Sequence, residues 1–335
     1  MRAYHFFLWH DNQRHRITYN EIHDTQTKGE PVGDITFGTT LRGTSGIAEF
    51  AQHVENLGFD VLGCGEHVMF HTPVANTFIS LSVAAGATQR LKLLSSIVLL
   101  PLYPAALAAK MGAALDVASN GRYMFGVGIG GEFPKEFEAC GVPVNQRGAR
   151  TNEALEVITK LWTEENVSYQ GRFTTLNDVT IAPAPTQKPH PPIWVAGRQE
   201  SAMKRTAKYA NGWLPYMFTP EQLYASIETI HRYGEEYGRD MSTLTPGVFI
   251  FTSVHANGDT GRQRCIEMLS CQYNQDFTKL VPRYALAGTP EECRKRLQEY
   301  IDAGAKMVIL APGSAEEYAD DNISLVAKEV IPEFR

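Results

Sequence analysis

The sequence predicts an α/β fold, a (β/α)8 TIM barrel with an insertion at residues 164–191. Short apolar segments alternate with helical segments over most of the chain. The apolar segments lack strict polar alternation, which indicates strands buried on both faces, as in parallel sheets. Eight such units fit the length that this barrel needs. A doubly wound open sheet, in which helices also alternate with parallel strands, is the alternative.

Eight segments have the short, apolar composition of buried strands. They are residues 34–41, 59–67, 91–100, 122–127, 193–197, 213–217, 247–256 and 306–313. Between the fourth and fifth of them lies the insertion, which is rich in proline and has hairpin-like alternation.

The helical segments are recognised by apolar spacing and by residues that start or stop helices. They are residues 45–58, 77–90, 104–121, 150–162, 201–212, 219–238 and 289–304, with a short helix at the C-terminus. In the first of these, Ser45 is a candidate N-cap and Gly58 ends the helix. Two others begin with a capping box in which threonine precedes proline and Gln or Glu stands at N3. These boxes are Thr219, Pro220 and Gln222, and Thr289, Pro290 and Glu292.

Composition excludes several classes of protein. The 335 residues are 43% hydrophobic and 20% charged, which is ordinary for a globular chain. The net charge is −6 and no basic block occurs, so nucleic-acid binding is not expected. The five cysteines form no C-x-x-C pair, which favours reduced thiols and a cytoplasmic location.

Domain organisation is expected to be simple. Residues 1–32 are polar, rich in histidine and aperiodic, and we interpret them as an N-terminal extension. Residues 33–335 are expected to form one barrel domain. The longest apolar stretch contains Pro101 and Pro104, and it is too short to cross a membrane.

Three glycines after the fourth predicted strand have the spacing of a dinucleotide-binding motif. Gly126, Gly128 and Gly131 form G-x-G-x-x-G, but such a motif must open directly into a helix. Here Pro134 interrupts the chain, and no second strand ending in an acidic residue follows. The glycines instead indicate a backbone that lets a flat or anionic ligand approach closely.

In a barrel, functional residues lie at the C-terminal ends of the strands. Glu66 and His67 follow the second strand as a potential acid–base pair, although a histidine hydrogen-bonded in the rim is the alternative. Gly197 and Arg198 stand between a strand and a helix, where they could hold a phosphate or form an ordinary surface turn. No metal site is expected, because Pro73 argues against a helix that would pair His67 with His71.

Several segments together resemble the luciferase-like flavin or deazaflavin oxidoreductases, the bacterial luciferase-like monooxygenase superfamily. The segments are residues 58–67, 100–162, 191–213 and 288–310, and the likeness extends over about residues 34–312. Their order, spacing and landmarks are most similar to the F420-dependent branch. The resemblance implies the same barrel that the strand pattern predicts.

The resemblance also implies roles for particular residues. Glu66 and His67 match the family's acidic-His pair, while Glu132 stands one residue later than a glutamate that is catalytic in some deazaflavin enzymes. Ser96 and Ile97 match a bulge, often with a non-proline cis bond, that lies behind the flavin ring. The implied cofactor-binding positions are Ser96, Ile97, Gly128, Gly130, Gly131, Ala196, Gly197 and Arg198.

The expected function is hydride transfer between coenzyme F420 and a small organic substrate, with His67 giving or taking a proton. An FMNH2- and O2-dependent monooxygenase is the alternative, and a non-catalytic flavin-binding barrel is a third hypothesis. The anionic tail of F420 would favour a basic cavity mouth. Loops after strands two, four and six and the insertion are expected to enclose the substrate, with Phe70 and Trp213 as aromatic walls. A homodimer is possible.

Overall fold

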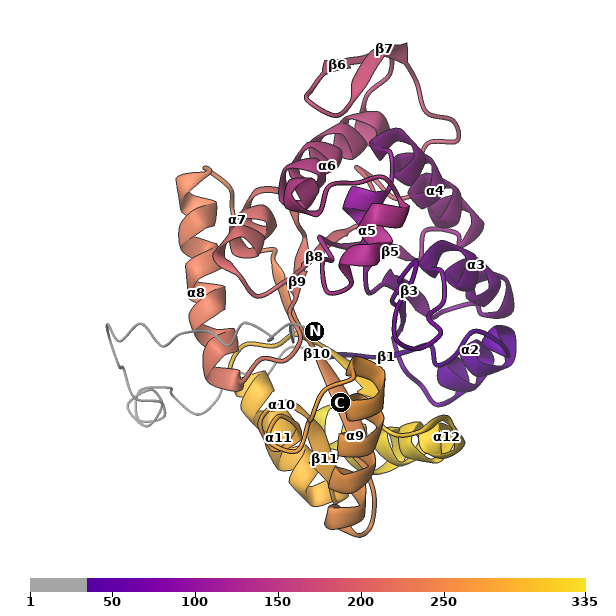
Figure 1. Cartoon of the computed structure of the whole chain (residues 1–335), viewed down its shortest axis with the longest axis vertical. Helices are drawn as coiled ribbons and strands as arrows, with labels where there is room; N and C mark the ends of the chain where they lie inside the picture. The colour runs from indigo at the N-terminus through magenta and orange to yellow at the C-terminus, as the bar shows by residue number, and fades with distance from the viewer. Residues whose placement is uncertain (1–34) are drawn as a thin grey trace. The chain divides into compact units, whose positions relative to one another are not determined.

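The computed structural model describes residues 35–335, which lie in one compact unit, Asp34–Arg335. The expectation for residues 1–32 falls outside the described residues. Eight parallel strands form a closed ring, and Figure 1 shows helices surrounding them. In ring order they are β1 (Thr36–Thr40), β2 (Val61–Cys64), β3 (Lys92–Ser95), β5 (Tyr123–Gly128), β8 (Ile193–Ala196), β9 (Gly212–Leu214), β10 (Thr245–Val254) and β12 (Met307–Pro312).

The ring closes because β12 pairs with β1, where Thr36 lies opposite Met307. Each predicted strand segment overlaps one strand of the ring, so the predicted (β/α)8 barrel is confirmed. Two short strands add to it: β4 (Val98–Leu99) pairs with β5, and β11 (Leu286–Gly288) pairs with the end of β10. The sequence analysis missed β11, because three residues that include a glycine carry little strand signal.

The predicted helices are present in the structure. They are α2 (Ile47–Asn56), α3 (Thr77–Ala87), α4 (Ala105–Ala118), α6 (Arg147–Thr163), α7 (Glu200–Tyr209), α8 (Pro220–Glu236), α11 (Pro290–Asp302) and α12 (Glu316–Leu325). Both predicted capping boxes form, at Thr219 and at Thr289. The predicted cap at Ser45 is wrong: α2 is preceded by Gly46 at φ 62°, and no side chain caps it.

Three helices were not predicted: α5 (Pro134–Ala139), α9 (Gly258–Tyr273) and α10 (Val281–Tyr284). Helix α9 buries only Gly261, Cys265 and Leu269, so its sequence shows no broad apolar stripe. Helix α5 is only six residues long and follows the glycine-rich segment directly. Both helices contribute to the site described below.

The insertion forms a two-stranded hairpin, β6 (Val167–Gln170) with β7 (Thr175–Val179). Figure 1 shows this hairpin outside α6, away from the centre of the ring. The carboxylate of Glu153 on α6 accepts hydrogen bonds from the backbone N–H groups of Arg172 and Phe173, both at 2.8 Å. The insertion is therefore anchored to the outer surface of the barrel.

The interior of the ring is filled by side chains from six of its strands, β2, β3, β5, β8, β9 and β12. This interior layer contains Val61, Leu94, Met124, Trp194, Leu214, Met307 and Ile309. A Cβ atom on Gly212 would lie 2.4 Å from the Trp194 ring, so this glycine makes room for the indole. Because the layer closes the ring from within, a ligand cavity can open only above it, at one end of the strands.

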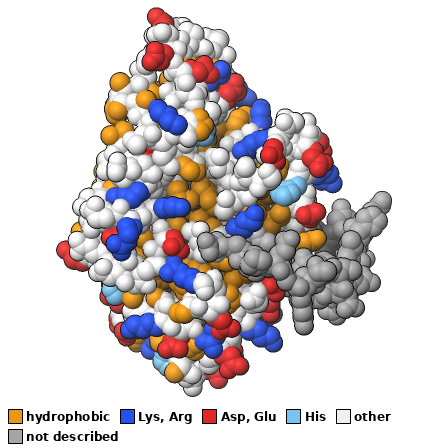
Figure 2. Space-filling view, turned by 180° about the vertical axis from the view of Figure 1, so that it is seen from behind, with side chains coloured by type: hydrophobic (Ala, Val, Ile, Leu, Met, Phe, Trp, Pro, Cys, Tyr) orange, Lys and Arg blue, Asp and Glu red, His pale blue; other side chains and the backbone are white. Residues whose placement is uncertain are grey.

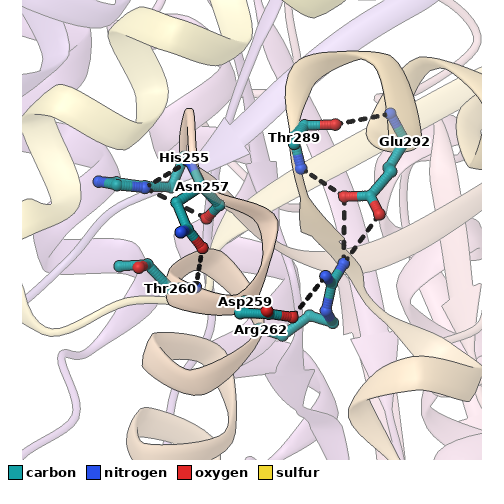
Figure 3. A network of polar contacts seen from close by, with 7 residues as sticks. All are labelled: His255, Asn257, Asp259, Thr260, Arg262, Thr289 and Glu292. Atoms are coloured by element: carbon teal, nitrogen blue, oxygen red, sulfur yellow. Dashed lines mark hydrogen bonds and ion pairs between the residues drawn. The ribbon is translucent and has the colours of Figure 1, made fainter.

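A polar network joins the loops that lead into α9 and α11 (Figure 3). Arg262 on α9 binds the carboxylates of Asp259 and Glu292, at 2.8 and 3.1 Å. Asn257 caps α9 by accepting a hydrogen bond from the N–H of Thr260 at 3.1 Å. The network fixes the N-terminal ends of both helices at the same rim of the barrel.

Charged side chains of both signs are interspersed on the face of the molecule shown in Figure 2. Among residues 35–335, no helix is long and apolar enough to cross a lipid bilayer.

Candidate active site

A cavity of about 560 Å³ opens at the C-terminal ends of the strands. This volume lies within the range of about 300–1,000 Å³ that is usual for small-molecule sites. Most of the predicted site residues line it. They are Glu66, His67, Phe70, Ser96, Ile97, Gly128, Gly130, Glu132, Ala196, Gly197 and Arg198.

The structure does not bring Trp213 or Gly131 to the cavity wall. Trp213 is fully buried, and its Nε1–H donates a hydrogen bond to the carbonyl of Gly197 at 3.0 Å. It therefore supports the turn after β8 from behind. A Cβ atom on Gly131 would lie 2.9 Å from Nε of Arg147, outside the cavity. No residue of the insertion 164–191 is among the lining residues.

One wall of the cavity is formed by the bulge between β3 and β4. The Ser96–Ile97 peptide bond is cis, at the position that the sequence comparison implied. The Ile97 side chain covers Gly128, where an added Cβ would lie 2.3 Å from its Cδ1 atom. A Cβ atom on Gly65 would lie 3.1 Å from the carbonyl oxygen of Ser96. The glycines thus let this wall pack closely and remain flat.

Two hydroxyl groups on the cavity wall have no hydrogen-bond partner among the described residues. They are Oγ of Ser96 and Oγ of Ser314, both shielded from solvent. Because almost no surface of either oxygen is accessible, these hydroxyls are directed into the protein and away from the cavity; Ser96 Oγ would lie 2.7 Å from a Cβ atom on Gly63. The side chains of Ile97 and Leu214 line the cavity beside them and make this part of the wall apolar.

The carboxylate of Glu66 is buried and surrounded by hydrogen-bond donors. It accepts from the N–H of Leu99 at 2.9 Å, the hydroxyl of Tyr103 at 3.1 Å, Nδ2 of Asn76 at 3.3 Å and the N–H of Thr77 at 3.4 Å. Burial raises the pKa of Glu66, although these donors act in the opposite direction. The contacts tie the end of β2 to α3 and to the chain that follows the bulge.

His67 is paired with a carboxylate that the sequence analysis missed. Its Nδ1 lies 3.1 and 3.2 Å from the two carboxylate oxygens of Glu136. Glu136, on α5, is fully buried and also accepts a hydrogen bond from the N–H of Val68 at 3.1 Å. The His67 ring stacks on Phe70, with ring centres 4.1 Å apart. These contacts fix the ring and leave Nε2 as the nitrogen that can exchange a proton with a ligand.

Nothing in the sequence distinguishes Glu136 from its neighbours. Glu132 and Glu138 are exposed acidic residues of the same segment, whereas Glu136 faces inward only because α5 folds over the rim. An inward-facing carboxylate near a histidine could be found only by placing this short helix in three dimensions.

Glu132, Tyr216 and Arg198 form a second polar group on the cavity wall. The Tyr216 hydroxyl donates a hydrogen bond to the Glu132 carboxylate. The Arg198 guanidinium lies over the Tyr216 ring, 5.0 Å from its centre. Burial, and then the nearby charge of Glu132, raise the pKa of Tyr216 well above its ordinary value, so the phenol keeps its proton at neutral pH.

The turn that carries Arg198 is shaped by Gly197, which has φ 124°. A Cβ atom there would lie 2.9 Å from Cβ of Ala202, so a side chain could not be accommodated. The turn leads into the N-terminal end of α7, where backbone N–H groups and the helix dipole favour an anion. The turn places Gly197, Arg198 and Gln199 on the cavity wall at the start of α7.

Comparison with known proteins agrees with this geometry. A family model described as luciferase-like monooxygenase matches residues 27–279. An F420-dependent glucose-6-phosphate dehydrogenase of Microbacterium testaceum is 24% identical over 330 residues, covering 88% of this chain and 94% of that protein. An FMNH2-dependent dimethylsulfone monooxygenase of Pseudomonas putida is 33% identical over 148 residues, covering 43% of this chain and 40% of that protein.

Uncharacterized proteins of Mycobacterium bovis and Mycobacterium tuberculosis are 32% identical over 167 residues, or 50% of this chain, and the match spans 57% of their length. The crystal structure of the monooxygenase RslO1 from Streptomyces bottropensis superimposes with a TM-score of 0.80 at 24% identity, covering 90% of this chain and all (100%) of that one. The structural likeness supports the barrel fold.

Glu66→Gln tests the burial of the Glu66 carboxylate. The fold favours the protonated acid, so wild-type stability should fall, relative to the variant, as the pH rises from the ordinary value of 4.5 through the raised pKa. Urea unfolding of both proteins between pH 4 and 8 would measure the difference. Glu164→Gln, at an exposed position, is the control. A difference of the opposite slope would contradict the assignment.

Proposed function

Since this chain belongs to the luciferase-like monooxygenase family, we propose that it is an oxidoreductase that transfers a hydride between coenzyme F420 and a small organic substrate. The family includes F420-dependent dehydrogenases and FMNH2-dependent monooxygenases. The observation that carries the proposal is the pair formed by His67, which lines the cavity, and the buried carboxylate of Glu136 at 3.1 Å.

The residues that would hold the cofactor follow from the cavity wall. Ser96 and Ile97 would lie behind the ring, and Gly128 and Gly130 let this wall pack closely against Ile97 and Leu99. Ala196, Gly197 and Arg198, in the turn after β8, would bind its phosphate. When bound, the deazaflavin supplies or accepts the hydride.

Side chains of this protein would transfer the proton and position the reacting groups. His67 would give a proton to the substrate or take one from it, because Glu136 holds its Nδ1 side. Glu66 would act by positioning, since its carboxylate is already used by four donors. Glu132 would likewise hold Tyr216 beside Arg198 rather than serve as the acid.

A monooxygenase that uses FMNH2 and O2 is the second candidate, and the charges of the cavity favour it. Among residues 35–335, the lining cations are Arg42 and Arg198 and the lining carboxylates are Glu66, Glu132 and Glu316, with His67 as the one imidazole. Binding of F420, which has an anionic tail, would be stabilised more by a basic cavity mouth. The single phosphate of FMN would need only the turn at Arg198. A non-catalytic flavin-binding barrel would have no use for a buried carboxylate at His67.

We also propose a cytoplasmic homodimer. Cys64, Cys265 and Cys293 are buried free thiols, which suits a reducing compartment. Ile79 on α3 and Leu107 on α4 are 66% and 49% exposed, so these neighbouring helices offer an apolar face. Sedimentation of the wild type as a monomer at micromolar concentration would exclude the dimer.

Titration with F420, FMN and FAD tests the cofactor. We expect F420 or FMN to bind in the micromolar range, with a change in its absorbance spectrum. Arg198→Ala should weaken that binding about tenfold, as expected for a lost charge-assisted hydrogen bond. Arg150→Ala is the control, because Arg150 lies over the Phe173 ring and does not line the cavity. If no cofactor binds, both enzymatic functions are excluded.

Single and double variants test the proton-transfer pair. His67→Ala should keep the cofactor affinity within about twofold and lower kcat by about 10²–10⁴-fold, the usual contribution of a general acid or base. Glu136→Gln should also lower kcat, and the double variant should be no slower than His67→Ala, because Glu136 acts through His67. Glu138→Gln, exposed on the same helix, is the control. Additive losses in the double variant would contradict this coupling.

A further inference from the structure

Five aromatic rings form a continuous wall across the cavity. His67 stacks on Phe70 at 4.1 Å, and Phe70 meets Tyr273 edge-on at 6.0 Å. Tyr273 in turn contacts Phe251 at 6.3 Å, and Phe251 contacts Phe249 at 5.3 Å. All five residues line the cavity. We refer to them as the aromatic wall.

The aromatic wall extends from the loop after β2, which carries His67 and Phe70, to β10 on the opposite side of the ring. Phe249 and Phe251 belong to β10, and Tyr273 ends α9, which packs beside β10 and β11 (Figure 1). In the ring order, β10 stands opposite β3, whose end carries Ser96. The space between Ser96 and the rings of Phe249, Phe251 and Tyr273 is therefore bounded by a proposed cofactor residue on one side and by aromatic rings on the other.

The charges around this space do not suit an anionic substrate. Arg42 binds the Asp320 carboxylate at 2.9 Å and donates to the Glu316 carbonyl at 2.7 Å. Arg198 is assigned to the cofactor phosphate, and no lysine is among the described lining residues. A substrate phosphate or carboxylate would thus be desolvated near Glu66 and Glu132 without a cation of its own, which is costly.

The position of His67 restricts the orientation of a substrate that packs against the aromatic wall. It lies at one end of the aromatic wall, in contact with Phe70. A molecule packed against the other rings would extend towards His67, where a carbonyl or hydroxyl group could exchange a proton. Aromatic rings favour offset or edge-on contact with another ring, worth about 0.5–1.5 kcal/mol beyond the buried area.

We propose that the substrate is an uncharged organic molecule with a planar apolar ring, which packs against Phe251 and Tyr273 and presents its carbonyl or hydroxyl group to His67. This inference rests on the proposed function and makes it more specific. It separates this chain from its relative that acts on glucose 6-phosphate, an anionic and strongly polar sugar.

The first experiment compares ligands on the cofactor-loaded protein. Absorbance titration first establishes which of F420 and FMN binds. Calorimetry of that complex then compares acetophenone with 4-acetylbenzoate, which has the same ring and ketone but an added carboxylate, and with glucose 6-phosphate. We expect acetophenone to bind at least about tenfold more tightly than either anion, the penalty of an unpaired buried charge. Equal or tighter binding of either anion would overturn the proposal.

The second experiment tests the aromatic wall itself. Tyr273→Ala should weaken acetophenone binding about tenfold and leave the cofactor affinity within about twofold. Because Phe251 is only 7% exposed, Phe251→Leu is used there to preserve packing, and a similar direction of change is expected. Tyr224→Ala, at a 38% exposed site on α8, is the control. Unchanged binding in both wall variants would overturn the proposal.

The titrations distinguish a wrong cofactor assignment from a wrong substrate class. If neither F420 nor FMN changes its spectrum on titration, the proposed function fails at that first step, and the substrate proposal falls with it. If a cofactor binds but its complex binds only the anionic ligands, the proposed function stands and the proposed substrate class is wrong.

Discussion

The site depends on the hydrogen bonds that the buried Glu66 carboxylate accepts. The N–H of Leu99 lies beyond the bulge, while Asn76 and Thr77 begin α3. One side chain therefore sets the positions of two separate segments relative to the end of β2. His67 is the next residue, so its backbone position follows from the same contacts. Glu66 and His67 are adjacent in sequence but have different contacts. The hydrogen bonds of Glu66 hold the backbone segments around the end of β2 in place.

The second constraint is the division of charge within the cavity. Glu136 and Glu132 each have a specific partner, one an imidazole and the other a phenol. Both carboxylates are engaged by these partners, and His67 lies on a wall that also contains aromatic rings, glycines and apolar side chains. Such a site can be selective by excluding charge as much as by attracting a partner.

The sequence predicted the ring of strands because strands buried on both faces leave a continuous apolar signal. The same reasoning placed most of the site, since the ends of parallel strands meet at one rim. It failed where side-chain direction mattered. Trp213 and Leu214 are neighbours on β9, but successive strand residues face opposite sides, so Leu214 enters the interior layer while Trp213 packs against Phe218 outside it. Glu136 and Tyr273 come from α5 and α9, helices whose patterns were too weak to recognise.

The layer of side chains around Trp194 has a kinetic consequence. This layer closes the barrel beneath the cavity, so molecules that bind above it would enter and leave through the same open end of the barrel. If two molecules bind one above the other in this cavity, the deeper one must bind first and leave last. Binding would then be ordered, because the outer molecule would block the exit of the inner one.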